Sequence, residues 1–481
     1  MSKTAFVSTA IPYVNAKPHV GFALELVQTD VIARYMRLMG YETYFLTGTD
    51  ENSLKNVRAA QELNIPVAEF CERNSESFRE LIPLLNISCD DFIRTSRDPR
   101  HKPAAQKLWS SSAVGDIYKR HYEGHYCVGC EDFYSMADYP DLVCPEHETP
   151  FELISEDNYF FGLSHYQERI LHLLESGGLR VIPESRGNEM LSFVRNGLRD
   201  FSISRTTKRA HGWGIPVPND PDQVMYVWYD ALTNYISALG FSDTGERFRR
   251  FWLEADQRIH VIGKGITRFH AIYWPAMLMS AKVALPHTLV VHGYLTINGQ
   301  KISKSLGNVI GPSAQVEKYG VDTFRYYLLR GISSFEDGDY SEERLKERHN
   351  GDLANNLGNL ISRIEAMGEK IQYIVSSEPQ QTVADEFHVA MKGFRFNDAL
   401  AILWTQCDEL NGLFETRKPW IALKEGRNED IKDLLDVAVQ KLQSFAFWLE
   451  PFLPTTARTM KELFSPGRKL VRTAPTFPRI R

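Results

Sequence analysis

The first part of the chain alternates short apolar runs with a segment of helical periodicity. Residues 4–9 (TAFVST) and 41–50 (YETYFLTGTD) form short, nearly continuous apolar runs, which is typical of strands buried on both faces. Between them, residues 21–40 place apolar side chains such as Leu24 and Val27 at helical spacing. A strand, a helix and a second strand predict a βαβ unit. Such units build a parallel sheet that binds ligands at the carboxyl ends of its strands.

The pattern changes twice further along the chain. Residues 116–223 are rich in aromatic residues and turns, and the α/β pattern then resumes until only helical periodicity remains after about Ser341. We therefore expect a Rossmann-type, doubly wound parallel-sheet domain that is split by an insertion and followed by an all-α helical bundle. The expected parts are 1–115 and 224–325 (the two halves of the Rossmann domain), 116–223 (insertion), 326–345 (linker) and 346–481 (helical bundle).

Composition narrows the class of protein. The 481 residues exceed what one hydrophobic core usually serves, so several domains are expected. The net charge of −6 argues against a general nucleic-acid-binding protein, and six cysteines do not make a disulfide scaffold in this length. No apolar run is long enough for a membrane span, and the start lacks the apolar region of a signal peptide. We therefore expect a cytoplasmic protein without membrane contact.

Two segments carry residue types that bind phosphate groups. In AKPHVGF (16–22), His19 stands two residues before Gly21 at the start of the predicted helix, where a helix N-terminus favours anions. In NGQKISKSLGNVI (298–310), two lysines and two serines lie between glycines, which suits a triphosphate whose charge shifts during a reaction. Taken alone, the first segment is also explained by a turn and the second by a solvated basic loop.

Together, PHVGF and KISKS resemble the two signature motifs of class I aminoacyl-tRNA synthetases, usually written HIGH and KMSKS. Several further segments are similar in order and spacing to the methionyl-tRNA synthetase family: AIPYVN, FLTGTDEN, GIPVP, VMYVWYDALTNY, GKGITRFHAIYWPA and YGVDTFRYYLLR. The resemblance extends over nearly the whole chain. It implies activation of L-methionine by ATP to methionyl adenylate, and transfer of the methionyl group to the 3′ end of tRNA(Met) for translation initiation and elongation.

The resemblance also implies roles for the residues of the two motifs. MgATP would be bound by His19, Gly21, Lys301, Ser303, Lys304 and Ser305. The catalytic contacts to the phosphates would be made by His19, Lys301 and Lys304. The linker would contact the tRNA stem, and the helical bundle would bind the anticodon.

A cysteine-rich stretch has the spacing of a zinc site. Cys127 and Cys130 form one close pair, and Cys144 and His147 form a second. Two such pairs can complete a tetrahedral zinc site, although unrelated surface thiols are the alternative. The resemblance agrees with zinc, since the inserted domain of this family commonly carries such a knuckle. No ligand suggests an open coordination position, so we expect one structural Zn²⁺ per chain.

A mostly aromatic group would be assigned to the core if it stood alone: Tyr13, Trp228, Tyr235, Ile266 and His270. The resemblance implies that these residues enclose the methionine side chain, whose polarisable thioether makes favourable contacts with aromatic rings. Asp50 would bind the α-ammonium group, because a buried cation needs an opposite charge. The backbone near Ala10 and Ile11 would close the pocket.

Three residues of the C-terminal helices have a second possible role. Asn359 and Arg363 are four residues apart and therefore share one helical face, and Trp420 follows a proline near another helix start. Alone they indicate a polar pair and a core tryptophan. The resemblance implies that they bind the CAU anticodon, where bases unstack onto aromatic rings and are hydrogen-bonded at their edges.

The chain departs from the family pattern near the motifs. Phe22 replaces the last histidine of HIGH, Asn52 and Ser53 replace a common His-Gly pair, and Gly265 replaces an aspartate. Ile302 replaces the methionine of KMSKS. Losing one hydrogen bond to a charged group costs about 1.5–3 kcal/mol. We therefore expect a divergent enzyme with weakened but retained adenylation.

Three alternatives stay open at this point. The nearest is a class I synthetase for another amino acid, such as leucine or cysteine. A second is a non-catalytic tRNA-binding protein that kept the fold, which Phe22 favours and an intact KISKS and Asp50 disfavour. A third is a zinc-ribbon nucleic-acid module, although the cysteines occupy a small part of the chain. Because the sequence ends soon after the helical bundle, we expect a monomer.

Overall fold

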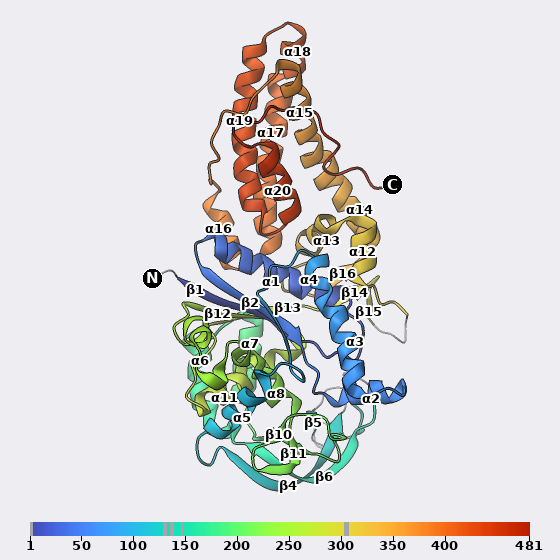
Figure 1. Ribbon diagram of the computed structural model, residues 1–481, viewed down its shortest axis with the longest axis vertical. Helices are drawn as coiled ribbons and strands as arrows, with labels where there is room; N and C mark the ends of the chain where they lie inside the picture. Colours follow the sequence, from blue (N-terminus) through green and yellow to red (C-terminus); the bar gives the residue numbers. More distant parts are fainter. Residues whose placement is uncertain (1–2, 128–131, 135–138, 146–147, 303–306) are drawn as a thin grey trace. The chain divides into compact units, whose positions relative to one another are not determined.

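The computed structural model describes residues 3–127, 132–134, 139–145, 148–302 and 307–481 (Figure 1). Its contacts divide the chain into two compact units. Unit 1 comprises Met1–Pro18, Gly40–Glu80 and Cys89–Val291, and unit 2 comprises His19–Met39, Leu81–Ser88 and His292–Arg481. The five-part division expected from the sequence stays a prediction.

Unit 1 is built on a parallel sheet with the strand order β3-β2-β1-β12-β13-β7. These strands are β1 (Thr4–Thr9), β2 (Glu42–Thr49), β3 (Asp91–Arg94), β7 (Arg180–Ile182), β12 (Gln257–Gly263) and β13 (Thr288–His292). β1 pairs in parallel with β2 on one side and with β12 on the other, so the chain extends the sheet in both directions. This confirms the predicted doubly wound sheet and its first two strands. Every residue of β1 is buried, which explains its unbroken run of apolar and small side chains.

One strand of this sheet comes from the predicted insertion. β7 pairs in parallel with β13, with Val181 opposite Leu289. The segment 116–223 is therefore not wholly separate from the main sheet. A three-residue strand is too short to show a periodic pattern, so it could not be predicted from the sequence.

The rest of the segment 116–223 forms two small antiparallel sheets. One has the order β5-β4-β6-β8 and the other the order β10-β11-β9. Their strands are β4 (Ile117–Cys127), β5 (Asp132–Tyr134), β6 (Glu152–Phe161), β8 (Phe201–Ser202), β9 (Ser204–Thr206), β10 (Pro216–Val217) and β11 (Asp220–Met225). The α-helices that the structure describes in this segment are α6 (Gln167–Glu175) and α7 (Glu184–Arg195).

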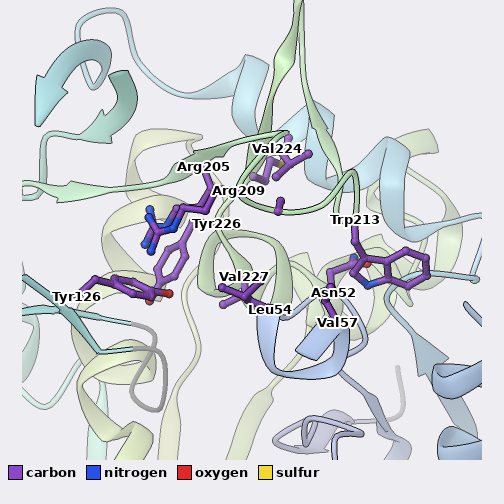
Figure 2. Close-up of a pocket in the computed structure, with 12 residues that line it drawn as sticks. Asn52, Leu54, Val57, Tyr126, Arg205, Arg209, Trp213, Val224, Tyr226 and Val227 are labelled. Atoms are coloured by element: carbon purple, nitrogen blue, oxygen red, sulfur yellow. The ribbon is translucent and has the colours of Figure 1, made fainter. Parts of the chain in front are cut away.

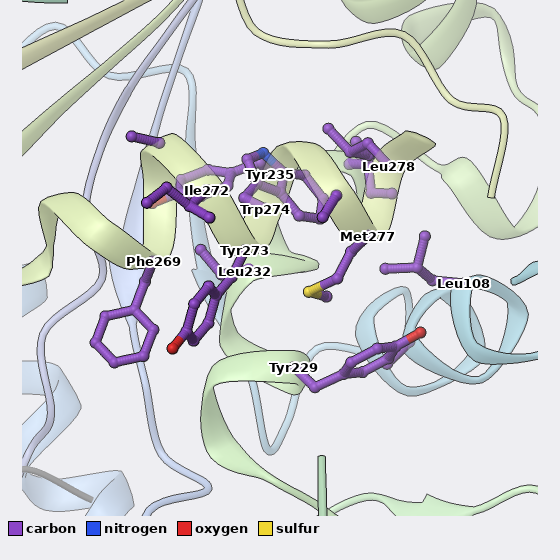
Figure 3. Packing of buried hydrophobic residues seen from close by; sticks show 14 of the residues in the cluster. Leu108, Tyr229, Leu232, Tyr235, Phe269, Ile272, Tyr273, Trp274, Met277 and Leu278 are labelled. Atoms are coloured by element: carbon purple, nitrogen blue, oxygen red, sulfur yellow. The ribbon is translucent and has the colours of Figure 1, made fainter. Parts of the chain in front are cut away.

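A continuous core fixes the helices that follow. Trp274 and Met277 of α11 (Trp274–Ser280) lie in one hydrophobic cluster with Leu108 of α5 (His101–Ser111) and Tyr229 of α8 (Val227–Leu232) (Figure 3). Other helical segments of unit 1 are α2 (Leu54–Glu62), α3 (Val67–Arg79), α9 (Asn234–Ser237), α10 (Glu246–Phe248), η1 (Leu163–Tyr166), η2 (Phe241–Asp243), η3 (Arg249–Leu253), η4 (Lys264–Ile266) and η5 (Phe269–Tyr273). The core therefore holds α8 in a fixed position, and α8 carries residues of the candidate site.

Unit 2 begins with α1 (Val20–Leu38), which confirms the helix predicted between the first two strands. A small sheet has the order β15-β14-β16, with β14 (Leu295–Ile297) antiparallel to β15 (Gln300–Lys301) and parallel to β16 (Gly338–Tyr340). The described part of the chain has no named strand after β16, as predicted from the helical periodicity.

The remaining elements of unit 2 are helices. They are α4 (Leu81–Leu84), α12 (Pro312–Tyr319), α13 (Val321–Tyr326), η6 (Tyr327–Gly331), α14 (Glu342–Arg348), η7 (His349–Gly358), α15 (Asn359–Ile371), α16 (Asp385–Lys392), α17 (Phe396–Arg417), α18 (Pro419–Lys424), α19 (Asn428–Leu449) and α20 (Pro454–Leu463). The helical periodicity after about Ser341 corresponds to helices that include α14, α15, α17 and α19, so the predicted bundle is confirmed. Among the described residues, no helix is both long and apolar enough to cross a membrane.

Candidate functional site

Asp50 lies at the carboxyl end of β2. Its backbone N–H donates to the carbonyl oxygen of Pro12 at 2.9 Å, and Asp50 forms an isolated parallel bridge with Tyr13. The backbone N–H of Asn52 donates to Asp50 Oδ1 at 3.2 Å, and Asp50 is only 2% exposed. A buried carboxylate at this end of a parallel sheet suits a small cationic group, such as an ammonium.

The predicted aromatic residues gather in unit 1. The ring centroids of Tyr13 and Trp228 lie 6.4 Å apart at an interplanar angle of 67°, and those of Trp228 and His270 lie 6.4 Å apart at 84°. Tyr235 lies 5.8 Å from His270 by the same measure. Because Tyr13 also bridges Asp50, the rings and the carboxylate share one region of unit 1.

The other predicted pocket residues lie around this group. The backbone N–H of Ala10 donates to the carbonyl oxygen of Val261 at 3.0 Å, which fixes the end of β1 against β12. Ile11 and Ile266 are partly buried and pack against the same hydrophobic core. The structure therefore brings the eight predicted pocket residues into one unit, while their role in binding stays a prediction.

Tyr235 and His270 form a buried hydrogen-bond chain. Nδ1 of His270 lies 3.0 Å from the carbonyl oxygen of Ile266, and Nε2 lies 2.7 Å from the hydroxyl of Tyr235. A carbonyl oxygen only accepts, so Nδ1 carries the proton and Nε2 of the neutral ring accepts from Tyr235. Burial lowers the pKa of His270 to about 4, which keeps the ring neutral at pH 7.

Two residues near the Tyr235–His270 hydrogen bond were not predicted from the sequence. The ring of Phe269 stacks on Trp228, with centroids 3.8 Å apart and nearly parallel planes. His260 of β12 lies 4.1 Å from Tyr235 by ring centroids and has Nδ1 2.7 Å from the Ser8 hydroxyl. A histidine in an apolar strand was a signal that could have been used, whereas nothing marked Phe269 among its aromatic neighbours.

Glu51, next to Asp50, belongs to a separate buried network. Nε of Arg94 donates to its carboxylate at 2.6 Å, and the hydroxyls of Ser75 and Ser96 also donate to it. Nε1 of Trp213 donates to the Glu51 carbonyl oxygen at 2.7 Å. Glu51 therefore anchors the loop after β2 through its side chain and its backbone.

A cavity of about 40 Å³ adjoins this loop (Figure 2). Its lining includes Asn52, Trp213 and two arginines that lie over tyrosine rings. The Arg209 guanidinium is 4.2 Å from the Tyr126 ring centroid, and no sequence pattern predicted this cluster. The cavity is too small for an amino acid or a nucleotide and is of the size that holds one or two waters.

In unit 2, His19 is the N-cap of α1. The Gly21 backbone N–H donates to Nδ1 of His19 at 3.0 Å, so the neutral ring carries its proton on Nε2 and can donate from there. Burial lowers the pKa of His19 from its ordinary value. A Cβ at Gly21 would lie 2.8 Å from Cε1 of His19, so only glycine fits beside the ring without displacing it.

The N–H groups of the first turn of α1 differ from the expectation for a phosphate site. Val20 donates to the carbonyl oxygen of Ile310 at 3.1 Å, and Gly21 donates to the His19 ring. Phe22 and Ala23 both donate to the His19 carbonyl oxygen. These four groups already have acceptors within the protein, so Nε2 of His19 and the positive helix end remain for an anion. The bond to Ile310 also ties this motif to the end of the segment 298–310.

A tight hairpin between β14 and β15 precedes the KISKS segment. Asn298 (φ 52°) and Gly299 (φ 75°) both adopt the left-handed conformation, as an Asn-Gly hairpin turn requires. The Gly299 N–H donates to Asp339 Oδ1 at 2.7 Å, which anchors the turn to β16. The backbone of Lys301 lies in β15. The predicted ATP residues Ser303, Lys304 and Ser305 lie outside the described residues.

Two of the four predicted zinc ligands are described. Cys127 ends β4, and the Glu148 N–H donates to the Cys144 carbonyl oxygen at 2.8 Å. Both cysteines are fully buried. Cys130 and His147 lie outside the described residues, and the described residues contain no group of three or more metal-binding side chains.

The predicted anticodon residues lie on α15 and α18. Asn359 is exposed, and the Arg363 guanidinium donates to Asn411 and, at 3.2 Å, to Glu415 of α17. Trp420 is 36% exposed, so the reading of Trp420 as a core residue is wrong. An exposed tryptophan is available for stacking, which a buried one is not.

Comparison with known proteins identifies the family. The profile of the family described as "tRNA synthetases class I (M)" matches residues 5–150 and 142–365. The methionine–tRNA ligase of Thermotoga maritima is 42% identical over 471 residues, which cover 94% of this chain and 74% of the relative. The methionine–tRNA ligase of Brucella suis is 41% identical over 478 residues, which cover 96% of this chain and 91% of the relative.

Solved structures agree with this result. Mycobacterium tuberculosis methionyl-tRNA synthetase in complex with methionyl-adenylate matches with a TM-score of 0.91 and 38% identity, covering 99% of this chain and 100% of that one. The apo form of the same synthetase matches with a TM-score of 0.85 and 36% identity. The predicted fold class is therefore confirmed as the class I synthetase fold. The chain belongs to the methionyl-tRNA synthetase family, a family of class I aminoacyl-tRNA ligases.

Proposed function

We propose that the chain activates L-methionine with ATP to methionyl adenylate and transfers the methionyl group to the 3′ end of tRNA(Met) with a CAU anticodon. The proposal rests most directly on the grouping of Tyr13, Trp228 and His270 beside the buried carboxylate of Asp50. Membership of the family and the methionyl-adenylate bound by the M. tuberculosis relative support the same reaction. It would serve translation initiation and elongation in the cytoplasm.

Methionine would be held at two ends. Asp50 would pair with the α-ammonium group, since a buried carboxylate favours a cation. Trp228, Tyr235 and His270 would enclose the thioether, with Ile266 and Tyr13 beside them and the backbone of Ala10 and Ile11 closing the pocket. Because His270 is neutral, the pocket carries no positive charge there to repel the ammonium or to favour an acidic side chain.

ATP activation needs charge stabilisation more than covalent chemistry. The methionine carboxylate attacks the α-phosphorus of MgATP, the bond to the bridging oxygen breaks, and pyrophosphate leaves. His19 would donate from Nε2 to a phosphate, and Lys301 and Lys304 would neutralise the charge that moves onto the pyrophosphate. Ser303 and Ser305 would complete the ATP contacts, and Gly21, which has no side chain, would leave room for the nucleotide beside the His19 ring. No side chain needs to be covalently modified.

A structural zinc ion would fold the knuckle in the inserted segment. Cys127 and Cys144 fit that role, since both thiols are fully buried. Cys130 and His147 would complete the four ligands by their sequence spacing. Zinc analysis of the purified chain tests this, with one Zn²⁺ per chain expected and loss of the metal expected in Cys144→Ser. The buried Cys407 of α17 provides a control, because Cys407→Ser should retain the metal.

The tRNA would be recognised by the helical part of unit 2. Asn359 and Arg363 would hydrogen-bond base edges and Trp420 would stack on a base of the anticodon. The chain would act as a monomer with the five predicted parts, and 326–345 would contact the tRNA stem.

Charging of tRNA transcripts tests the proposal. Initiator and elongator transcripts with CAU should accept methionine, and changing the anticodon should abolish charging. Trp420→Ala should lower charging about fivefold or more, because one base–aromatic stack is worth about 1–3 kcal/mol. Val437→Ala is a matched control at an exposed apolar residue. Equal charging of transcripts with CAU and with a changed anticodon would refute the proposed tRNA specificity.

A further inference from the structure

A buried hydrogen-bond chain runs behind the loop after β2. Nδ2 of Asn52 donates to Asp230 Oδ2 at 2.7 Å, and Nε2 of His101 lies 2.5 Å from Asp230 Oδ1. Nδ1 of His101 lies 2.8 Å from the hydroxyl of Ser237. Asp230, His101 and Ser237 have no exposed surface, so each depends on these partners.

This hydrogen-bond chain joins the elements that carry the proposed methionine pocket. Asp230 lies on α8, which also carries Trp228, and Ser237 lies on α9, which also carries Tyr235. At its other end, Asn52 donates its backbone N–H to Asp50 Oδ1 at 3.2 Å. One residue, Asn52, therefore contacts Asp50 with its backbone and Asp230 with its side chain.

The hydrogen-bonding capacity of Asp230 explains why the residue at position 52 must be a donor. Asp230 is a fully buried carboxylate that only accepts hydrogen bonds, and His101 supplies one donor to Oδ1 while Asn52 supplies one to Oδ2. An acceptor at position 52 would set two oxygens against each other at the fully buried Asp230. The Asn52 amide is thus fixed in one orientation, with Nδ2 towards Asp230, and this fixes the turn that holds Asp50.

We infer that Asp230 is a positioning residue for amino-acid recognition: acting through Asn52, it holds the Asp50 carboxylate in place for the ammonium group of the substrate. This inference rests on the proposed function, since it concerns the same site. His101 is hydrogen-bonded to the other carboxylate oxygen of Asp230. The hydrogen-bond chain thereby aligns Asp50 with α8 and α9, which carry the rings of Trp228 and Tyr235.

Substitutions at position 52 test the inference in the full-length enzyme. Asn52→Asp keeps the shape of the side chain but removes the donor, so it should raise the KM for methionine at least about tenfold, the loss of a hydrogen bond to a charged group. Asn52→Ala should raise it less, because no carboxylate then faces Asp230. Asn52→His, which restores a ring N–H donor, should stay close to the parent enzyme. The control is Gln106→Ala on α5. The Gln106 side-chain amide donates to the carbonyl oxygen of Pro216, which is not part of the hydrogen-bond chain through Asp230.

A desamino analogue separates positioning from general loss of structure. The inhibitor 4-(methylthio)butanoate has the thioether and carboxylate of methionine but no ammonium for Asp50. In Asn52→Asp its inhibition constant and the KM for ATP should stay within about twofold of the parent values. Equal weakening of methionine and the analogue, or an unchanged KM for methionine, would overturn the inference. Should Asn52→Asp not fold, Asn52→Ala carries the same comparison. Absence of methionine-dependent exchange in the parent enzyme would refute the proposed function instead.

Discussion

The hydroxyl of Tyr235 donates to Nε2 of His270 across 2.7 Å, and the direction of this bond is fixed from the far side of the imidazole. Nδ1 must donate to the carbonyl oxygen of Ile266, which leaves Nε2 as an acceptor. Both side chains are almost completely buried, so neither can exchange its partner for water. The proposed thioether pocket therefore has a wall with a single hydrogen-bond arrangement.

Removing the donor should weaken this wall. Tyr235→Phe leaves Nε2 of His270 buried without its tyrosine donor, which costs about 1–3 kcal/mol of stability. The KM for methionine in ATP–pyrophosphate exchange should rise, while the KM for ATP should change little. Tyr229→Phe is a matched control, since Tyr229 is equally buried but its hydroxyl lies 3.4 Å from Ser112. A Tyr235→Phe enzyme with the parent stability and KM would show that the bond has no role.

Acid should destabilise the protein through His270. The pKa of this ring is about 4 in the folded chain against an ordinary value of 6.5, because burial disfavours the charged form. Between these values the unfolded chain binds more protons than the folded one. The contribution is therefore fully present above pH 6.5 and is lost progressively as the pH falls towards 4, by about 3 kcal/mol.

Unfolding by urea at several pH values measures this effect. The free energy of unfolding should fall between pH 6.5 and 4, and His270→Gln should reduce the slope in that range. Some slope should remain, because burial also lowers the pKa of His260. Equal slopes in the parent and in His270→Gln would exclude His270 as a source of the acid sensitivity.

The contact between Gly21 and His19 gives a test of the phosphate motif. In Gly21→Ala the new Cβ would lie 2.8 Å from Cε1 of His19, so the ring must move and Nε2 with it. Exchange activity should fall at least about tenfold, the effect of losing a hydrogen bond that acts in the transition state. Gly412→Ala is the control, because a Cβ there meets no atom within 4 Å. Full activity in Gly21→Ala would argue against His19 as a phosphate donor.

Local patterns predicted the elements well, because a buried strand and a periodic helix are recognisable from neighbouring residues. The strand at 4–9 and the helices α17 and α19 are examples. β7 was missed because its three residues join the sheet only through β13, more than a hundred positions later in the sequence.

The candidate site was likewise predictable only in part. Residues within motifs, such as His19 and Asp50, could be identified from the sequence, but their hydrogen bonds could not. The link from Asn52 to Asp230 and His101 joins three distant segments, so no local pattern contains it. The exposure of Trp420 also depends on tertiary packing, which helical periodicity alone does not determine.

Amino-acid-dependent ATP–pyrophosphate exchange tests the central claim most directly. The purified full-length enzyme is given MgATP, labelled pyrophosphate and one amino acid at a time, including methionine, leucine and cysteine. The account predicts exchange with methionine that exceeds exchange with the other two, and loss of that exchange in Lys304→Ala. Exchange that prefers leucine or cysteine, or no methionine-dependent exchange at high enzyme concentration, would contradict it.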